Sequence, residues 1–396
     1  MPLPNWFRAV LPEDWQQGGF GLYIHWPFCQ SKCPYCDFNS HVTDAVDQAV
    51  WAQAYCAEID RISTETVSKP LKSVFFGGGT PSLMLPETVD TILRKARQSW
   101  AFSNDIEITL EANPTSVEAS RFAGYKDAGV NRVSIGIQAL NDADLRRLGR
   151  LHSVAEARAA FDVATSVFDR NSFDLIYARQ DQSLDDWRAE LGMALSMAAD
   201  HLSLYQLTIE QGTAFGDRLS AGGLHGLPQE DLAADMYAIT QELTSAAGFY
   251  AYEISNHCKA GSESRHNLIY WQGGDYAGIG PGAHGRLTLD GVRLATECPK
   301  MPQVWLNSVH DKGHGELNRQ TLSAHERADE YLMMGLRVSG GIDLGRYESI
   351  AGQSLYISKI NMLEDFGLVL RQDGRLIATE QGRPVLNAII KELLTE

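Results

Sequence analysis

Short apolar stretches alternate with longer amphipathic stretches through the first two thirds of this chain. The apolar stretches are rich in Val, Ile, Leu, Phe and Tyr, which is typical of β-strands. Several are continuously apolar, as in strands that are buried on both faces. The predicted strands span residues 21–27, 73–76, 106–111, 132–138, 173–177 and 201–209.

The stretches between these strands have helical periodicity. They span residues 45–64, 86–98, 116–128, 154–167, 184–197 and 229–247. Pro86 and Gly129 stand where a helix would begin and end. Six successive strand–helix units imply a parallel sheet with right-handed crossovers. Because a closed barrel has eight units, the pattern predicts an α/β fold with a partial (β/α)6 barrel.

The last third has a different pattern, and a chain of 396 residues is too long for one core. We predict that the barrel and a following glycine-rich segment occupy residues 1–297. Residues 298–321 carry Pro, Gly, Asn and Lys and are predicted to be a linker. Residues 322–396 combine helices with a β-hairpin around Asp373-Gly374, which favours a C-terminal winged-helix-like α+β domain. We expect this domain to act as a protein contact or a lid.

Charge and hydropathy narrow the range of partners. The net charge of −16 argues against nucleic acid, because phosphate binding needs a basic face. No apolar run approaches the roughly 20 residues of a membrane span, so we expect at most peripheral membrane contact. The first residues lack a basic start followed by an apolar stretch. We therefore expect no signal peptide and a cytoplasmic location.

Cys29, Cys33 and Cys36 crowd into eight residues, whereas the other three cysteines are scattered. In a cytoplasmic protein such crowding favours metal binding, here directly after the first strand, where α/β proteins place active sites. Three thiolates can hold three irons of a [4Fe–4S] cluster and leave the fourth iron open. The alternative is a zinc site with His25 or His41 as its fourth ligand.

A second motif, Gly77-Gly78-Gly79-Thr80, follows the second predicted strand. Three glycines allow the backbone to approach a ligand closely, because no Cβ is in the way. Free backbone N–H and C=O groups there can hold the ammonium and carboxylate of an amino acid. Alone, such a run can be a simple tight turn, but beside a three-cysteine loop it favours the iron–sulfur cluster over the zinc site.

The runs YIHWPFCQSKCPYC (residues 23–36) and FFGGGTPSL (residues 75–83) resemble the radical S-adenosylmethionine (SAM) superfamily. The resemblance is narrower to the branch of oxygen-independent coproporphyrinogen III dehydrogenase and the HemW family of heme chaperones, and it extends to the final helix. It implies a [4Fe–4S] cluster on the three cysteines and bound SAM. The residues that it implies for the SAM site are Tyr23, Tyr35, Gly78, Gly79, Thr80, Glu111, Gln138, Arg150, Asp174 and Thr208.

The chemistry of three of these residues fits such a role. Glu111 and Asp174 can bind ribose hydroxyls or an ammonium group, and Arg150 can pair with a carboxylate. One departure from the family lies after Tyr177, where the family tends to have glycine, another residue and then proline. This chain has Ala178-Arg179-Gln180 instead, so we expect the loop there to differ.

Two features separate the chaperone from the dehydrogenase. Phe38 stands where the dehydrogenase usually has a further cysteine, and only 28 residues precede Cys29, where the dehydrogenase has a long arm. The run from His266 to Trp271, HNLIYW, resembles the motif that the chaperone family associates with heme. Because neutral imidazole is a standard axial ligand of heme iron, His266 is the leading candidate. A hydrogen-bonded structural histidine is the alternative.

The sequence therefore favours a heme chaperone that keeps the cluster and the SAM site. It would bind heme and pass it to an acceptor hemoprotein, of which a respiratory hemoprotein is one candidate. The competing hypothesis is an enzyme in which the 5′-deoxyadenosyl radical abstracts hydrogen from a porphyrinogen propionate.

Overall fold

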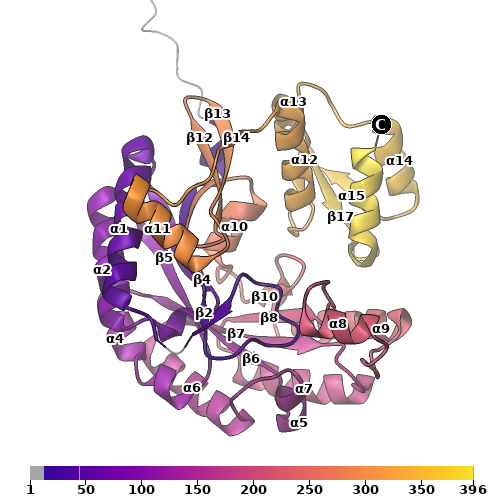
Figure 1. The fold of residues 1–396 in the computed structure, drawn as a ribbon. Helices are drawn as coiled ribbons and strands as arrows, with labels where there is room; N and C mark the ends of the chain where they lie inside the picture. The colour runs from indigo at the N-terminus through magenta and orange to yellow at the C-terminus, as the bar shows by residue number, and fades with distance from the viewer. Residues whose placement is uncertain (1–12, 44, 396) are drawn as a thin grey trace, which may run out of the picture.

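The computed structural model describes residues 13–43 and 45–395, and its core is one open sheet (Figure 1). The predicted absence of a signal peptide concerns residues that lie mostly outside this range. Six parallel strands form the centre of the sheet in chain order, as the sequence predicts. They are β1 (Phe20–Trp26), β4 (Leu71–Gly78), β5 (Phe102–Ala112), β6 (Arg132–Gln138), β7 (Arg170–Tyr177) and β8 (His201–Gln206).

Helices follow these strands and cover the outer face of the curved sheet, at the left and bottom of Figure 1. They shield the outward side chains, which are apolar, from water. Two short helices, α3 (Ser116–Ala119) and α4 (Phe122–Ala128), stand where one helix is predicted. The longer ones are α1 (Gln48–Thr66), α2 (Pro86–Ser99), α6 (Val154–Val167), α7 (Leu184–Met197) and α9 (Glu230–Ala246).

Both edges of the sheet are extended, so the barrel stays open. Beyond β1 lies the parallel strand β11 (Asp275–Ile279). The antiparallel strands β12 (His284–Leu289), β13 (Val292–Glu297) and β14 (Gln320–Thr321) continue that edge. Beyond β8 lie the antiparallel strands β10 (Asn256–Cys258) and β9 (Tyr250–Ala251). The partial (β/α)6 barrel is therefore confirmed.

The inner face of the sheet is unusually polar. Because side chains alternate along a strand, Glu107, Thr109 and Glu111 of β5 share one face. Helix α10 (Arg265–Trp271) lies against this inner face, where the backbone N–H of His266 donates to a Glu107 carboxylate oxygen at 3.2 Å. The polar interior thus holds α10 below the carboxyl ends of the strands.

The prediction of a linker over residues 298–321 is wrong for most of that segment. It contains α11 (Pro302–Lys312) and β14, which pairs with β13. Trp305 is completely buried and stacks on Trp51 of α1, with ring centroids 5.5 Å apart. Trp305 and Val309 give α11 an apolar face at helical spacing, which the surrounding Pro, Gly, Asn and Lys residues masked.

A separate apolar cluster holds the C-terminal helices around a three-stranded sheet. Figure 1 draws this part at the upper right. Ion pairs join it to the barrel, from Arg346 to Asp14 at 2.7 Å and from Arg286 to Glu330 at 2.6 Å. The elements are α12 (Ala324–Gly335), β15 (Ile342–Asp343), α13 (Leu344–Ala351), α14 (Ile357–Asp365), β16 (Val369–Gln372), β17 (Arg375–Ala378) and α15 (Leu386–Leu394).

The predicted hairpin turn is present, with Asp373 and Gly374 both at positive φ, as a type I′ turn requires. Among the residues that the structure describes, no helix has the length and apolar character needed to cross a membrane.

Candidate functional site

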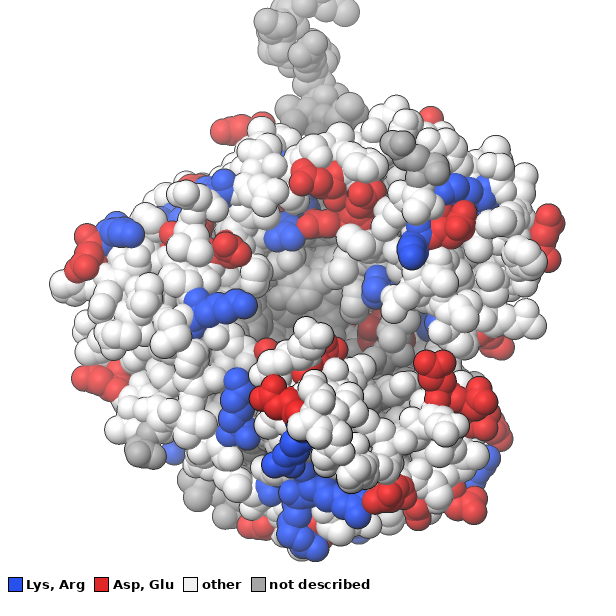
Figure 2. Space-filling model, turned by 45° about the vertical axis from the view of Figure 1, so that its right-hand side comes forward, with Lys and Arg blue, Asp and Glu red and all other residues white. Residues whose placement is uncertain are grey.

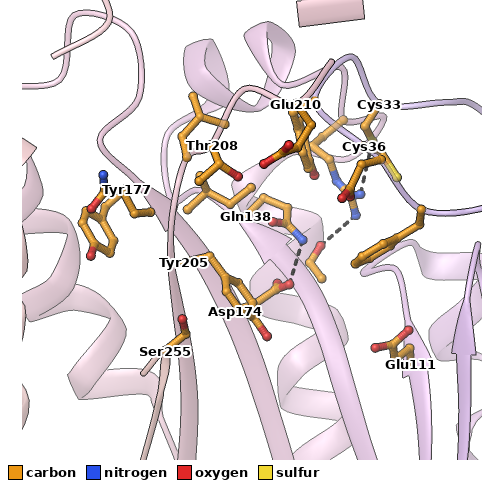
Figure 3. Close-up of a pocket in the computed structure, with 18 of the residues that line it drawn as sticks. Cys33, Cys36, Glu111, Gln138, Asp174, Tyr177, Tyr205, Thr208, Glu210 and Ser255 are labelled. Atoms are coloured by element: carbon orange, nitrogen blue, oxygen red, sulfur yellow. Dashed lines mark hydrogen bonds between the residues drawn. The ribbon is translucent and has the colours of Figure 1, made fainter. Parts of the chain in front are cut away.

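A cavity of about 1060 Å³ opens at the carboxyl ends of the parallel strands, with residues of the C-terminal part on its wall. Figure 2 shows it as a deep hollow in the face turned to the viewer, and Figure 3 shows part of its lining. The cavity brings together all three motif cysteines and nine of the ten residues predicted for SAM. These lining residues are Cys29, Cys33, Cys36, Tyr35, Gly78, Gly79, Thr80, Glu111, Gln138, Arg150, Asp174 and Thr208.

The cysteine loop is closed at its base by a small parallel pair of strands, β2 (Phe28–Cys29) and β3 (His41–Val42). A turn inside the loop brings Cys36 N–H to the Cys33 carbonyl at 3.1 Å. The Asn39 side chain donates to the carbonyls of Pro281 and Lys300, each at 2.9 Å, and so anchors the loop to the segments that follow β11 and β13.

The three thiols face the cavity beside polar neighbours. Thr80 Oγ1 lies 3.4 Å from Cys29 Sγ, and Arg150 Nη1 lies 3.6 Å from Cys33 Sγ. Burial raises the pKa of the Cys29 thiol and of the Cys36 thiol.

The raised pKa favours the protonated form of both thiols, and a bound cation favours their thiolates. Three cysteines on one loop fit a cubane cluster, which takes one ligand on each of three irons. Among the described residues, no three His, Cys, Asp or Glu side chains lie close enough together to hold a single metal ion.

The glycine loop does not clear space for a ligand in the way the sequence suggests. A Cβ on Gly78 would lie 2.7 Å from the His25 ring, at a backbone φ of +113°. A Cβ on Gly79 would lie 2.8 Å from the Phe28 carbonyl oxygen. At these two positions the glycines therefore allow the loop to pack against the strand that enters the cysteine loop.

Arg150 and Asp174 both line the cavity, and Figure 3 shows Asp174 beside Gln138. Arg150 Nη2 donates to Asn113 Oδ1 at 2.6 Å and to the Gly136 carbonyl at 2.8 Å. Gln138, with a left-handed φ of 72°, donates to Asp174 Oδ2 at 2.9 Å. The other carboxylate oxygen of Asp174 is buried and has no hydrogen-bond partner among the described residues, so it is free to accept one from a ligand.

Glu111 and Asp174 are partly buried, and both have raised pKa values. Burial, followed by the charge of Asp174, raises the pKa of Glu111 to about 7. Burial raises the pKa of Asp174 to about 6, although Arg150 and Gln138 oppose this shift. No nearby cation fully offsets the cost of burying these carboxylates. Hydroxyl or ammonium groups of a ligand would supply the missing hydrogen-bond partners.

Tyr23 and His266 do not line the cavity. His266 is 1% exposed, its Nδ1 lies 2.7 Å from Ser73 Oγ, and its Nε2 lies 2.6 Å from the Tyr270 hydroxyl. Its ring stacks on Phe75 and lies 6.3 Å from the Tyr23 ring. Because both ring nitrogens are engaged and buried inside the barrel, this arrangement favours the structural alternative for His266.

Sequence reasoning missed several cavity residues. Asn113 connects two predicted SAM residues, because it also donates to Thr80 Oγ1 at 3.3 Å. Its place just after β5 was a usable signal. Tyr205, Arg337 and Arg383 also line the cavity, and the two arginines lie in the C-terminal part, far away in sequence.

The loop after β7, where the sequence departs from the family pattern, has an unusual backbone conformation. Ala178 and Asp181 adopt positive φ values of 58° and 56°, which are uncommon for residues other than glycine. Arg179 is buried and pairs with Glu190 at 2.6 Å and Asp144 at 2.9 Å. This ion-pair network holds the loop in place.

An open parallel barrel, a three-cysteine loop after its first strand and a cavity of carboxyl groups beside that loop together define a radical SAM protein. Comparison with known proteins agrees. The Radical SAM superfamily matches residues 23–193, and the HemN C-terminal domain matches residues 322–385.

The chain is 37% identical to the heme chaperone HemW of Escherichia coli, over 95% of this chain and 98% of that protein. It is 38% identical to the mitochondrial radical S-adenosyl methionine domain-containing protein 1 of Bos taurus, over 94% of this chain and 87% of that protein. The chain belongs to the radical SAM superfamily, in the family that contains these two proteins. Membership implies a [4Fe–4S] cluster and SAM.

Coproporphyrinogen III oxidase (HemN) from Escherichia coli has the same fold. Its TM-score is 0.80 at 20% identity, over 95% of this chain and 90% of that one. At this identity the likeness shows the fold alone.

Proposed function

We propose that this protein is a heme chaperone, which binds heme and passes it to an acceptor hemoprotein, with a [4Fe–4S] cluster and SAM at the barrel mouth. The observation that carries this proposal is the match to HemW along nearly the full length of both chains. Respiratory hemoproteins are the acceptors that we favour, and the cytoplasm is the expected location.

The cavity supports this proposal because it offers two different environments. Near the cysteine loop, Glu111, Asp174 and Arg150 suit the polar groups of SAM. Towards the C-terminal part, Val385 and Ile254 present apolar surface, which suits a porphyrin ring. A volume of about 1060 Å³ reaches the upper end of the roughly 300–1,000 Å³ typical of small-molecule pockets.

The residues of the chain have separate tasks in this proposal. The three cysteines would hold the cluster, and Arg150 would pair with the carboxylate of SAM. SAM at a reduced cluster supplies radical chemistry when both are bound. Phe38, which is 61% exposed and lines the cavity, stands where the dehydrogenase usually has a further cysteine.

Oxygen-independent coproporphyrinogen III dehydrogenase is the second candidate, because the fold matches that of HemN. One experiment separates the two functions. The anaerobically reconstituted protein is incubated with coproporphyrinogen III, SAM and a reductant, and separately with heme. The proposal predicts a Soret band from bound heme and no protoporphyrinogen IX. Accumulation of protoporphyrinogen IX would establish the dehydrogenase instead.

A further inference from the structure

Two arginines of the C-terminal part line the cavity without any carboxylate partner. Arg337 follows α12, and Arg383 begins the short 3-10 helix η4 (Arg383–Val385). Neither guanidinium group lies within ion-pair distance of a described Asp or Glu side chain. Most other arginines in buried or half-buried positions do form ion pairs, such as Arg346 with Asp14.

The two guanidinium groups are partly withdrawn from water. Arg337 Nη2 donates to Asn387 Oδ1 at 3.1 Å, and its Nη1 contacts the Met333 carbonyl. Burial alone lowers the pKa of Arg337, with no negative charge nearby to oppose the shift. Arg383 Nη1 is buried and has no hydrogen-bond partner among the described residues. Withdrawing a cation from water with only neutral partners is costly, so an anion would stabilise this wall.

The surroundings of Arg383 respond to its positive charge inside the wall. This charge adds to burial in lowering the pKa of His257 to about 4. The charge of Arg383 and its side-chain hydrogen bond with Tyr237, a cavity residue on α9, also oppose the rise that burial causes in the pKa of Tyr237. A ligand carboxylate would relieve this uncompensated charge.

The surface beside the arginines limits the kind of anion. Pro384, Val385 and Leu386 follow Arg383 directly, and Ala233, Ala234 and Ile254 also line the cavity. A ligand that suits this wall is large and apolar with carboxylates at one edge, which describes a porphyrin with two propionates. SAM is a poorer match, because its single carboxylate has Arg150 beside the cysteine loop.

We propose that Arg337 and Arg383 form a propionate-binding site, which holds the two carboxylates of heme while its ring lies on the adjoining apolar wall. This inference rests on the proposed heme-chaperone function. It adds that the propionate edge of heme binds to the C-terminal part. Guanidinium groups bind carboxylates through charge-assisted hydrogen bonds with two-pronged geometry.

The test compares heme with heme dimethyl ester, in which both carboxylates are blocked. The full chain with its reconstituted cluster is titrated with each ligand, as wild type and as Arg337→Gln, Arg383→Gln and Arg383→Lys. Arg371→Gln is the control, because Arg371 lies in the same part of the chain and pairs with Glu364 outside the cavity. Iron content and thermal unfolding show that each variant is folded.

The wild type and the control should bind heme at least tenfold more tightly than the ester. Arg337→Gln and Arg383→Gln should lose most of this preference while binding the ester as the wild type does, and Arg383→Lys should keep part of it. Equal affinity of the wild type for heme and ester would overturn the propionate site and leave the chaperone function intact, as would an unchanged preference in both glutamine variants. Failure of the wild type and the control to bind heme at all would overturn both.

Discussion

The motif cysteines differ from the other cysteines in the surroundings of their thiols. Cys29, Cys33 and Cys36 line the cavity, whereas Cys258 and Cys298 are buried away from it. We expect replacement of any one motif cysteine by Ala to remove most of the bound iron, because a cubane loses one of its three protein ligands.

Cys258→Ala and Cys298→Ala are the matched controls and should keep the full iron and sulfide content. Chemical determination of iron and sulfide in each purified variant tests this expectation. A full cluster in the Cys33→Ala variant would disprove the assignment of the ligands.

The raised pKa of Glu111 makes stability depend on pH. Its folded-state value of about 7 lies above the usual carboxyl value of about 4.3. Between these values the folded chain holds a proton that the unfolded chain releases, so this group lowers stability as pH rises through the window. Glu111→Gln, which cannot ionise, should therefore be more stable than the wild type at pH 8 and similar to it near pH 5.

Denaturant unfolding at both pH values measures this difference. The same variant should bind SAM more weakly at pH 8, because it lacks the carboxylate. A Glu111→Gln protein that is less stable than the wild type at pH 8 would show that the charge of Glu111 is compensated in the fold.

His266 is expected to stabilise the barrel rather than to bind iron. His266→Ala would leave the buried Ser73 and Tyr270 hydroxyls without their partners and remove a stacked ring. We expect a loss of about 2–4 kcal/mol in the free energy of unfolding. Phe75→Leu, which removes the other ring of the stack, is the control.

The heme complex of the folded His266→Ala protein should keep the Soret maximum of the wild type. A Soret shift in that variant, absent from the Phe75→Leu variant, would return His266 to the role of iron ligand that its motif suggested.

Among the elements, the glycine loop after β4 illustrates close packing between two functional loops. Gly79→Ala would place a Cβ 2.8 Å from the Phe28 carbonyl oxygen, next to Cys29. We expect this change to displace the entry to the cysteine loop and to lower both stability and iron content. A Cβ on Gly192 in α7 would meet nothing within 4 Å beyond the backbone of its own helix, so Gly192→Ala is the matched control.

Gly192→Ala should stabilise the protein by about 0.5–1 kcal/mol, as alanine does in helix interiors. Unfolding curves and iron content of both variants test these two expectations. If Gly79→Ala retained the stability and iron content of the wild type, the loop would accommodate a Cβ at this position, which contradicts the close packing described above.

The elements that the sequence predicts well are those with a strong local pattern. All six parallel strands and the long helices between them follow from apolar runs and helical periodicity. Helix α11 was missed because Trp305 and Val309 stand among residues typical of a linker, and only packing against α1 reveals its apolar face. The orientation of the His266 side chain could not be predicted from the sequence either, because the motif does not indicate which side of α10 faces the barrel interior.

For the whole molecule, the cavity depends on parts of the chain that are distant in sequence. The cysteines, Glu111 and Asp174 were predictable, because consecutive parallel strands end at one edge of the sheet. Arg337 and Arg383 were not, since their place on the cavity wall depends on how the C-terminal part sits on the barrel. Both the barrel and the C-terminal part therefore supply polar and apolar residues to the cavity wall.

Directed transfer of heme to an acceptor is the property that separates a chaperone from a passive heme binder. The heme-loaded protein is mixed with an excess of the apo form of a b-type respiratory hemoprotein. A parallel reaction uses apomyoglobin, which binds heme only after the protein has released it. The rate of heme gain is followed by absorbance. A chaperone should transfer heme to the respiratory acceptor faster than apomyoglobin gains it. Equal rates with the two acceptors would contradict directed transfer and reduce the protein to a passive heme binder.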